Sequence, residues 1–225
     1  MDETSELGGA RIHGDGATMR LSLKGGVYTI WVENTELMSS SIHKSEDDLA
    51  RVVCARLKYL PEAKILIGGL GMGFTLAAAL KELGPKGQVV VAELMPAVLE
   101  WNRSVLADLA GRPLEDSRVV VKIQDVAHSL QTELTEFDAI LLDVDNGPEG
   151  LTRGSNDWLY SQEGLAAAYT ALRPNGILAI WSSTPDKNFG MRLRKAGFEV
   201  EEKSVYSSND ERADRHTIFL AVNRG

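Results

Sequence analysis

The feature that most constrains the fold is an apolar run that opens into closely spaced glycines, ILIGGLGMGFT at residues 65–75. Such a run is typical of a buried strand that enters a tight turn. Strong helix formers follow over Leu76–Leu83, and Gly84-Pro85 ends them. A second apolar run, Gln88–Glu93, ends on an acid. These residues predict a strand, a glycine turn, a helix and a second strand closed by a carboxylate.

A unit of this kind can hold a nucleoside, because glycines admit a ligand to the backbone and the acid accepts hydrogen bonds from ribose hydroxyls. The dinucleotide fingerprint G-x-G-x-x-G places its third glycine where this chain has Phe74. The spacing of Gly69, Gly71 and Gly73 fits the shorter turn of S-adenosylmethionine (SAM) binders. Glycines also occur in any tight strand-to-helix turn, so Glu93 carries the nucleoside interpretation.

The rest of the chain alternates between strand-like and helix-like segments. The expected strands after the glycine turn are Gln88–Glu93, Arg118–Gln124, Phe137–Asp143, Ile177–Trp181, Phe198–Val205 and Thr217–Val222. Strands that alternate with helices predict a mostly parallel sheet with helices on both faces. No helix separates the final two strands, so we expect that pair to be antiparallel.

The N-terminal part has a different pattern. Residues 1–17 are polar and rich in glycine, and we expect a flexible lead-in. Thr18–Leu23 and Val27–Val32 flank a Lys-Gly-Gly turn and predict a hairpin, so residues 18–44 are expected to form a small β element. Ser45, followed by three acids, is a good helix N-cap, and the catalytic domain is expected over residues 45–225.

Composition limits the partners and the compartment. The chain has 225 residues, a net charge of −8 and no block of lysine or arginine, which argues against a nucleic-acid partner. The acidity would suit a cationic small substrate, although many soluble proteins are equally acidic. The single cysteine excludes an internal disulfide, and the absence of a signal peptide or long apolar span predicts a cytoplasmic protein without a membrane partner. His43 and His216 show no metal-ligand spacing, so no metal is expected.

Acids follow three of the expected strands. Ligands bind outside the carboxyl ends of parallel strands, so Glu93, Asp125 and Asp143 should meet the glycine turn at one edge. We assign Glu93 to the ribose hydroxyls, Asp125 to the adenine amino group and Asp143 to the reacting end of the cofactor. For Asp125, capping of the helix that follows is an equally good interpretation. The full set expected to bind the cofactor is Gly69, Gly71, Met72, Gly73, Glu93, Leu94, Asp125 and Val126.

The residues 68–75, Glu93, Asp125 and Phe137–Pro148 together resemble the catalytic domain of spermidine synthases, within the SAM-dependent methyltransferase superfamily. The resemblance spans most of residues 27–222. It implies a doubly wound, mostly parallel α/β sheet of seven strands with an antiparallel last strand, preceded by a small β element. It also implies a donor that is SAM or decarboxylated SAM, a small amine acceptor and a homodimer.

Two departures from the family keep the transferred group open between methyl and aminopropyl. Where spermidine synthases carry an aspartate in the glycine loop that holds the aminopropyl amine, this chain has Met72. The second aspartate of their strand-end motif becomes Asn146, with Asp145 as a substitute. A buried ammonium without its carboxylate costs several kcal/mol, so decarboxylated SAM is in doubt as the donor.

If the acceptor is an amine, Asp143 would hold its ammonium form and help to remove the proton, with assistance from Asp145. The segment 145–158 is expected to form a lid, and Asn146, Trp158 and Tyr160 are candidates to line the acceptor site. For Trp158, Tyr160 and Trp181, packing in the core is the simpler role. Two other functions remain: a non-catalytic nucleoside-binding protein of the same fold, and a nicotinamide-dependent dehydrogenase, which Phe74 disfavours.

Overall fold

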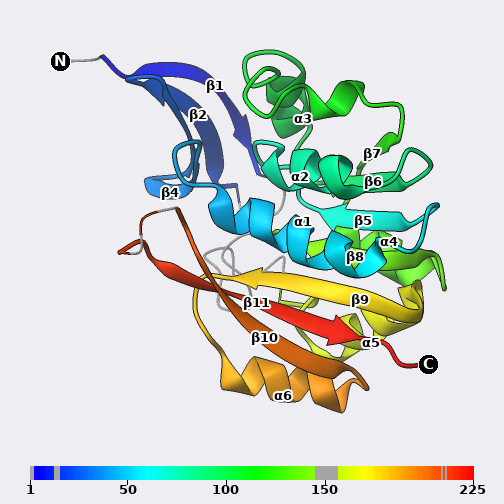
Figure 1. Ribbon diagram of the computed structural model, residues 1–225. Helices are drawn as coiled ribbons and strands as arrows, with labels where there is room; N and C mark the ends of the chain where they lie inside the picture. The colour runs from blue at the N-terminus through cyan, green and yellow to red at the C-terminus, as the bar shows by residue number, and fades with distance from the viewer. Residues whose placement is uncertain (1–2, 13–15, 145–156, 209, 211) are drawn as a thin grey trace.

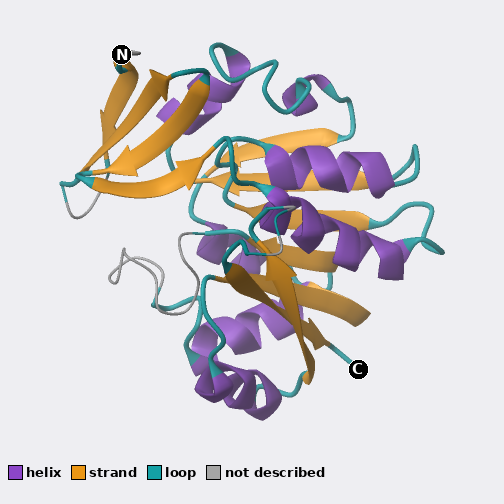
Figure 2. Ribbon diagram, turned by 60° about the vertical axis from the view of Figure 1, so that its left-hand side comes forward, coloured by secondary structure: helices purple, strands orange, loops and turns teal. Residues whose placement is uncertain are grey.

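A seven-stranded sheet with helices on both faces lies beside a smaller antiparallel sheet built by the N-terminal residues (Figures 1 and 2). The structure, a computed structural model, describes residues 3–12, 16–144, 157–208, 210 and 212–225. The mixed α/β architecture with a mostly parallel sheet confirms the fold class expected from the sequence.

The large sheet has the strand order β10-β11-β9-β8-β5-β6-β7. Strands β5 to β9 run parallel to their neighbours, whereas β11 is antiparallel to both β9 and β10. The expected antiparallel pairing of the last two strands is therefore confirmed, with the last strand inserted between β9 and the edge strand. The strands are β5 Lys64–Gly68, β6 Gln88–Glu93, β7 Val119–Ile123, β8 Phe137–Leu142, β9 Leu172–Ser182, β10 Glu199–Tyr206 and β11 Arg215–Val222.

Helices cover the two faces of this sheet and enclose two separate apolar cores. One core contains side chains of α1, α2 and α3, and the other contains side chains of α4, α5 and α6. Their bounds are α1 Lys44–Leu57, α2 Phe74–Glu82, α3 Pro96–Arg103, α4 Val126–Thr132, α5 Gln162–Ala171 and α6 Lys187–Lys195, with a short 3₁₀ turn at Pro113–Glu115. Both cores are rich in β-branched and leucine side chains from the buried central strands, as a parallel sheet covered on both faces requires.

The strand order reverses direction at β5. The chain first adds β6 and β7 on one side of β5, and later adds β8 and β9 on the other. In open α/β sheets the crevice at such a switch point is where ligands bind. The glycine turn that follows β5 opens at this point.

The N-terminal sheet has the order β1-β2-β3-β4 and is larger than the sequence indicated. The expected hairpin is present as β2 (Thr18–Lys24) and β3 (Val27–Val32), and β4 (Thr35–Ser39) extends it. The expectation of a flexible lead-in is wrong for Ser5–Arg11, which forms β1 and pairs with β2. The glycines of this segment argued against a strand. Packing nevertheless explains Gly8, because a Cβ there would lie 2.7 Å from Nε1 of Trp101.

The start of α1 also differs from expectation. His43 is the N-cap residue and makes no side-chain capping bond. Ser45 lies inside the helix, where its Oγ donates to Oε2 of Glu46 at 2.6 Å. The helix begins earlier because Lys44 N donates to the carbonyl of Ser207 at 3.3 Å, a tertiary contact that no local pattern reveals.

Arg118 ties the end of α2 to the start of β7, and we expect its removal to destabilise the fold. Its guanidinium donates to the carbonyls of Leu80 and Leu83, both at 3.0 Å, and to Oδ2 of Asp116 at 2.7 Å. Arg118→Ala should lower the free energy of unfolding by roughly 1–3 kcal/mol, because it leaves partly buried acceptors unpaired. Urea denaturation measures this change.

The matched control for that variant is Arg112→Ala. Within the described part of the chain, Arg112 pairs with two exposed acids, Asp108 and Glu115. Its removal should change the free energy of unfolding by no more than about 0.5 kcal/mol. Equal losses in the two variants would show that the carbonyl contacts of Arg118 contribute nothing.

Candidate active site

The glycine turn after β5 depends on backbone that favours glycine. Gly69, Gly71 and Gly73 have φ angles of +89°, +51° and +84°. A Cβ on Gly69 would lie 2.5 Å from the carbonyl oxygen of Asp143, which is backbone and cannot move aside cheaply. Gly73 is the N-cap residue of α2. The turn therefore brings bare backbone and the N-terminus of a helix to the carboxyl ends of the strands.

Glu93, at the end of β6, holds this turn in shape. Its side chain is buried, and Oε2 accepts from Leu70 N at 2.8 Å while Oε1 accepts from Met95 N at 2.7 Å. A carboxylate has about four acceptor positions, so capacity remains for hydroxyl groups of a ligand. Glu93 thus lies where the sequence placed it, beside the glycine turn.

A cavity opens between the glycine turn and the N-terminal sheet. Strand ends of the large sheet contribute its polar side, with Gly69, Glu93 and Asp143, and β9 contributes Trp181. The small sheet contributes an apolar wall from β2, β3 and β4, together with Ile12. The lining residues are Ile12, Met19, Ile30, Val32, Leu37, Met38, Glu46, Gly69, Gly71, Glu93, Leu94, Met95, Val98, Asp143, Val144 and Trp181.

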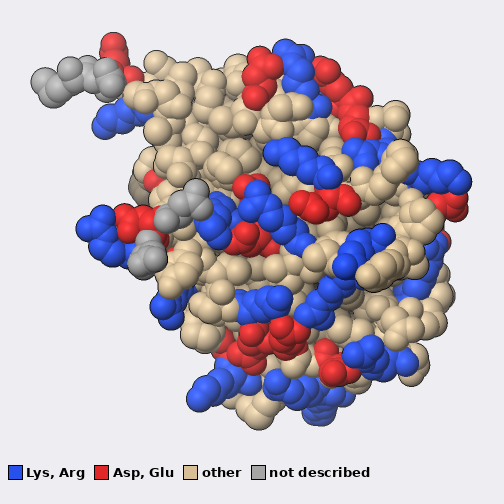
Figure 3. Space-filling view, viewed as in Figure 1, with Lys and Arg blue, Asp and Glu red and all other residues tan. Residues whose placement is uncertain are grey.

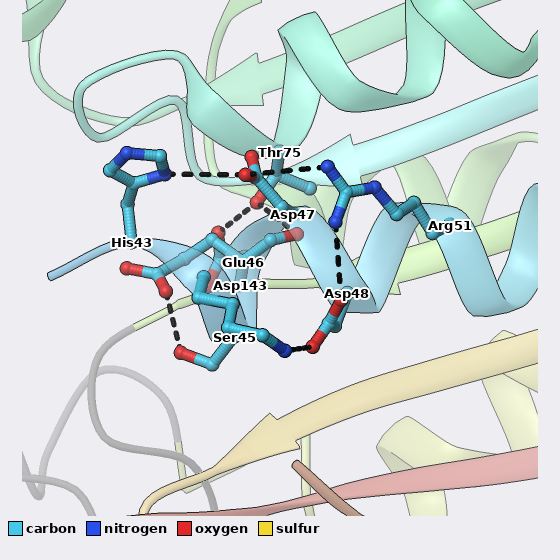
Figure 4. Close-up of polar contacts among 9 residues, drawn as sticks. His43, Ser45, Glu46, Asp47, Asp48, Arg51, Thr75 and Asp143 are labelled. Atoms are coloured by element: carbon cyan, nitrogen blue, oxygen red, sulfur yellow. Dashed lines mark hydrogen bonds and ion pairs between the residues drawn. The ribbon is translucent and has the colours of Figure 1, made fainter. Parts of the chain in front are cut away.

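Asp143 follows β8 and is held by the turn and by α2. Its backbone N donates to Gly68 O at 3.0 Å, and its Oδ2 accepts from Thr75 Oγ1 at 2.6 Å (Figure 4). Burial raises the pKa of Asp143, and the hydrogen bond from Thr75 opposes that rise. A buried carboxyl that faces a cavity and resists ionisation is a candidate acid or base.

Glu46 is a third carboxyl in the cavity, beside Glu93 and Asp143, and sequence reasoning missed its role. It comes from the first turn of α1, and Figure 4 shows it beside Thr75 and Asp143. Burial, and after it the charge of Asp143, raises the pKa of Glu46 from its ordinary 4.5 to about 7. In the sequence Glu46 is one of three acids after Ser45 and looks like an ordinary helix start. Only the packing of α1 against α2 brings it to the site.

Four expected cofactor residues remain, Met72, Leu94, Asp125 and Val126, and the structure places them differently. Leu94 lines the cavity, and Val126 packs against Gly68. Asp125 is the N-cap of α4, where its Oδ1 accepts from Ala127 N at 2.8 Å; the capping interpretation is correct. The side chain of Met72 is fully buried in the apolar core and is not part of the cavity lining.

Of the residues expected near the acceptor, the structure describes Trp158 and Tyr160 but not Asp145 and Asn146. Tyr160 is buried, and its hydroxyl donates to Val144 O at 3.3 Å; Trp158 packs against the same core. Asp145 and Asn146, and most of the expected lid, lie outside the described residues. Trp181, expected in the core, packs partly against it but also lines the cavity, where its buried Nε1 makes no hydrogen bond within the described residues.

Some findings concern partners of the whole molecule. On the face shown in Figure 3, Lys and Arg side chains are interspersed with Asp and Glu. No helix among the described residues is long and apolar enough to cross a membrane. Over the same ranges of the chain, no cluster of three or more His, Cys, Asp or Glu side chains is placed to hold a metal ion.

A glycine turn at the switch point of a doubly wound sheet, with a carboxylate at the end of the next strand, is the arrangement at which Rossmann-type α/β domains bind nucleotides. The sequence model of the spermine/spermidine synthase domain matches residues 46–188 of this chain. The chain belongs to this family.

Curated relatives include polyamine aminopropyltransferases. The protein of that name from Mycobacterium tuberculosis is 30% identical over 200 residues, which cover 85% of this chain and 35% of the relative. The one from Korarchaeum cryptofilum is 26% identical over 161 residues, covering 72% of this chain and 44% of the relative. The chain thus spans less than half the length of these relatives.

Solved structures agree on the fold. Spermidine synthase from Thermotoga maritima superposes with a TM-score of 0.77 at 18% identity, covering 97% of this chain and 72% of that one. A spermidine synthase in complex with the transition-state analogue AdoDATO gives a TM-score of 0.75 over the same shares. At this identity the likeness shows a shared fold.

The raised pKa of Glu46 predicts a pH-dependent stability. A carboxyl whose pKa is about 7 in the folded chain and 4.5 otherwise stabilises the fold fully below about pH 4.5, and that contribution is lost as pH rises through 7. Relative to Glu46→Gln, the free energy of unfolding of the wild type should therefore fall between pH 5 and 7, by roughly 1–3 kcal/mol. Chemical denaturation at several pH values measures the difference.

Asp48→Asn is the control for this series. Asp48 lies in the same helix α1, but it pairs with Lys44 and Arg51 and does not line the cavity. Its curve should run parallel to that of the wild type between pH 5 and 7. A constant difference between wild type and Glu46→Gln across that range would contradict the assignment.

Proposed function

We propose that this protein is a transferase that moves an aminopropyl group from decarboxylated SAM to a small amine. The observation that carries the proposal is the placement of a buried carboxyl, Asp143, in the same cavity as the glycine turn and Glu93. Membership of the spermine/spermidine synthase family and the names of the relatives from M. tuberculosis and K. cryptofilum support it.

In the proposed reaction the chain mainly binds, aligns and moves one proton. The bound donor supplies an electrophilic carbon on a positively charged sulfur, which leaves as a neutral thioether. Glu93 and the glycine turn hold the nucleoside, and alignment of the two reactants contributes up to roughly 7–11 kcal/mol. As the new N–C bond forms, the amine nitrogen gains positive charge, and Asp143 accepts a proton from it. The raised pKa of Asp143 suits this role, since it brings the pKa of the carboxyl closer to the working pH.

Met72 is buried and offers no carboxylate to an aminopropyl ammonium, so the amine of decarboxylated SAM needs a carboxylate from another element. Glu46 supplies a carboxyl to the cavity from a different element, and it can take that role. Methyl transfer from SAM is the second candidate, and the buried Met72 is the observation that favours it. A non-catalytic nucleoside-binding protein is a third outcome of the tests below.

The same proposal includes roles for the other residues expected in the site. Asp125 is proposed to bind the adenine amino group while it caps α4, and Asp145 to assist Asp143. Asn146, Trp158 and Tyr160 are proposed to shape the acceptor site. A homodimer, a small-molecule acceptor, a cytoplasmic location and the absence of a nucleic-acid partner complete the proposal.

Ligand-dependent stability separates the candidates. Thermal unfolding is measured with decarboxylated SAM, SAM, methylthioadenosine and NAD, because a ligand at ~100 times its dissociation constant adds ~2.7 kcal/mol of stability. We expect methylthioadenosine and decarboxylated SAM to stabilise the protein more than NAD. A response to NAD alone would overturn the proposal, and a response to SAM but not to its decarboxylated form would select methyl transfer.

Two substitutions separate binding from chemistry. Asp143→Asn should leave nucleoside affinity within about threefold, because it keeps shape and a hydrogen-bond acceptor for Thr75, and should lower turnover by 10²-fold or more because the base is lost. Glu93→Ala should weaken nucleoside binding by at least tenfold, since it removes the ribose acceptor and the brace on Leu70. Calorimetry and steady-state rates with an amine panel give both quantities. Normal turnover in Asp143→Asn would disprove its assigned role.

A further inference from the structure

Two carboxyls from distant parts of the chain line one cavity. Glu46 comes from the first turn of α1 and Asp143 from the end of β8, and both are part of the cavity lining. Thr75 connects them: its Oγ1 lies 2.6 Å from Oδ2 of Asp143 and 3.4 Å from the backbone carbonyl of Glu46. Thr75 has one hydroxyl proton, and the shorter contact directs it to Asp143. Thr75 thus holds the Asp143 carboxyl against α2, and α2 packs on α1, which carries Glu46.

The other contacts of the pair come from neutral groups. Ser45 Oγ donates to Oε2 of Glu46 at 2.6 Å. Among the described residues that line the cavity there is no lysine, arginine or histidine. Two carboxylates in such a site repel each other and lose hydration, so one of them keeps a proton at a pH where both would otherwise be ionised.

Charged groups on the neighbouring elements are engaged elsewhere. On α1, Lys44 pairs with Asp48, and Arg51 reaches Asp47 and Asp48 at 3.8 and 3.4 Å. His43 lies 3.3 Å from Asp47 and stacks on Phe74, the first residue of α2.

The remaining sides of the cavity offer the pair no cation either. Glu93 of β6 accepts from two backbone amides. The ring of His216 of β11 lies tilted against Trp181, with ring centroids 4.8 Å apart, and its Nδ1 lies 3.3 Å from Ser183 O. The N-terminal sheet contributes only apolar side chains to the lining. A cation for the pair must therefore come from a ligand or from outside the described residues.

We propose that Glu46 and Asp143 act as one two-carboxyl unit, which holds a single proton in the free protein and releases it to solvent when a cationic group of the ligand binds in the cavity. Glu46 then sets the pH at which Asp143 becomes a base, and it is a positioning residue that acts through Asp143. This inference deepens the proposed function and rests on it for the identity of the cation, an ammonium or a sulfonium. The shared proton is a property of the free protein.

The test follows the two carboxyl carbons by ¹³C NMR during a pH titration of the free protein, with signals assigned by Glu46→Gln and Asp143→Asn. In the wild type we expect the pair to lose its last proton near pH 7. In Glu46→Gln, the Asp143 signal should titrate at least one pH unit lower, a tenfold change in its acid dissociation constant. Asp48→Asn, which alters a carboxyl of α1 outside the cavity, should leave both signals unchanged.

The acidic limb of the pH–rate profile gives a second readout. If the protein turns over amines as proposed, this limb should move to lower pH in Glu46→Gln by the same amount, and it should not move in Asp48→Asn. Wild-type carboxyls that are both ionised by pH 5 would overturn the shared proton, and this result needs no folded variant. An unchanged Asp143 titration in Glu46→Gln would overturn it as well. Lack of any turnover, with the NMR result as expected, would count against the proposed function alone.

Discussion

The site depends on the bond between the Glu93 carboxylate and the backbone amide of Leu70. The turn from β5 into α2 has three glycines with positive φ, and glycine loses more conformational entropy on folding than any other residue. Glu93 offsets that cost with two charge-assisted hydrogen bonds to buried amides, at Leu70 and Met95. The carboxylate that we propose as the acceptor of ribose hydroxyls thus also shapes the glycine turn. In that proposal, binding and local folding are linked through one side chain.

The N-terminal sheet converts an open crevice into a cavity. Without it the carboxyl ends of β5, β6 and β8 would face solvent, as in any open doubly wound sheet. Met38 of β4 illustrates the contact: its Sδ would lie 3.0 Å from a Cβ on Gly71, so the glycine is needed for this approach as well as for its φ angle. Water excluded by this apolar wall strengthens the interactions of Asp143 and Glu46 with each other and with any cation.

The sequence predicted the parts of the fold that follow from local residue chemistry and from the spacing of apolar residues. The glycine turn, the order of strands and helices, and the position of Glu93 beside the turn are all confirmed, because strand ends of a parallel sheet meet at one edge. The sequence did not predict the features that depend on tertiary contacts. Ser5–Arg11 forms a strand despite its glycines because β2 pairs with it, and α1 starts at Lys44 because Ser207 binds its amide. Glu46 carries no local mark of its role, since α1 must first pack on α2 to bring it beside Asp143.

The account rests on a nucleoside bound between the glycine turn and Glu93, and a crystal structure with methylthioadenosine tests that most directly. It should show ribose hydroxyls within hydrogen-bond distance of the Glu93 carboxylate and the thioether sulfur directed toward Asp143 and Glu46. A nucleoside bound at any other edge of the sheet, or a ribose beyond the reach of Glu93, would contradict it.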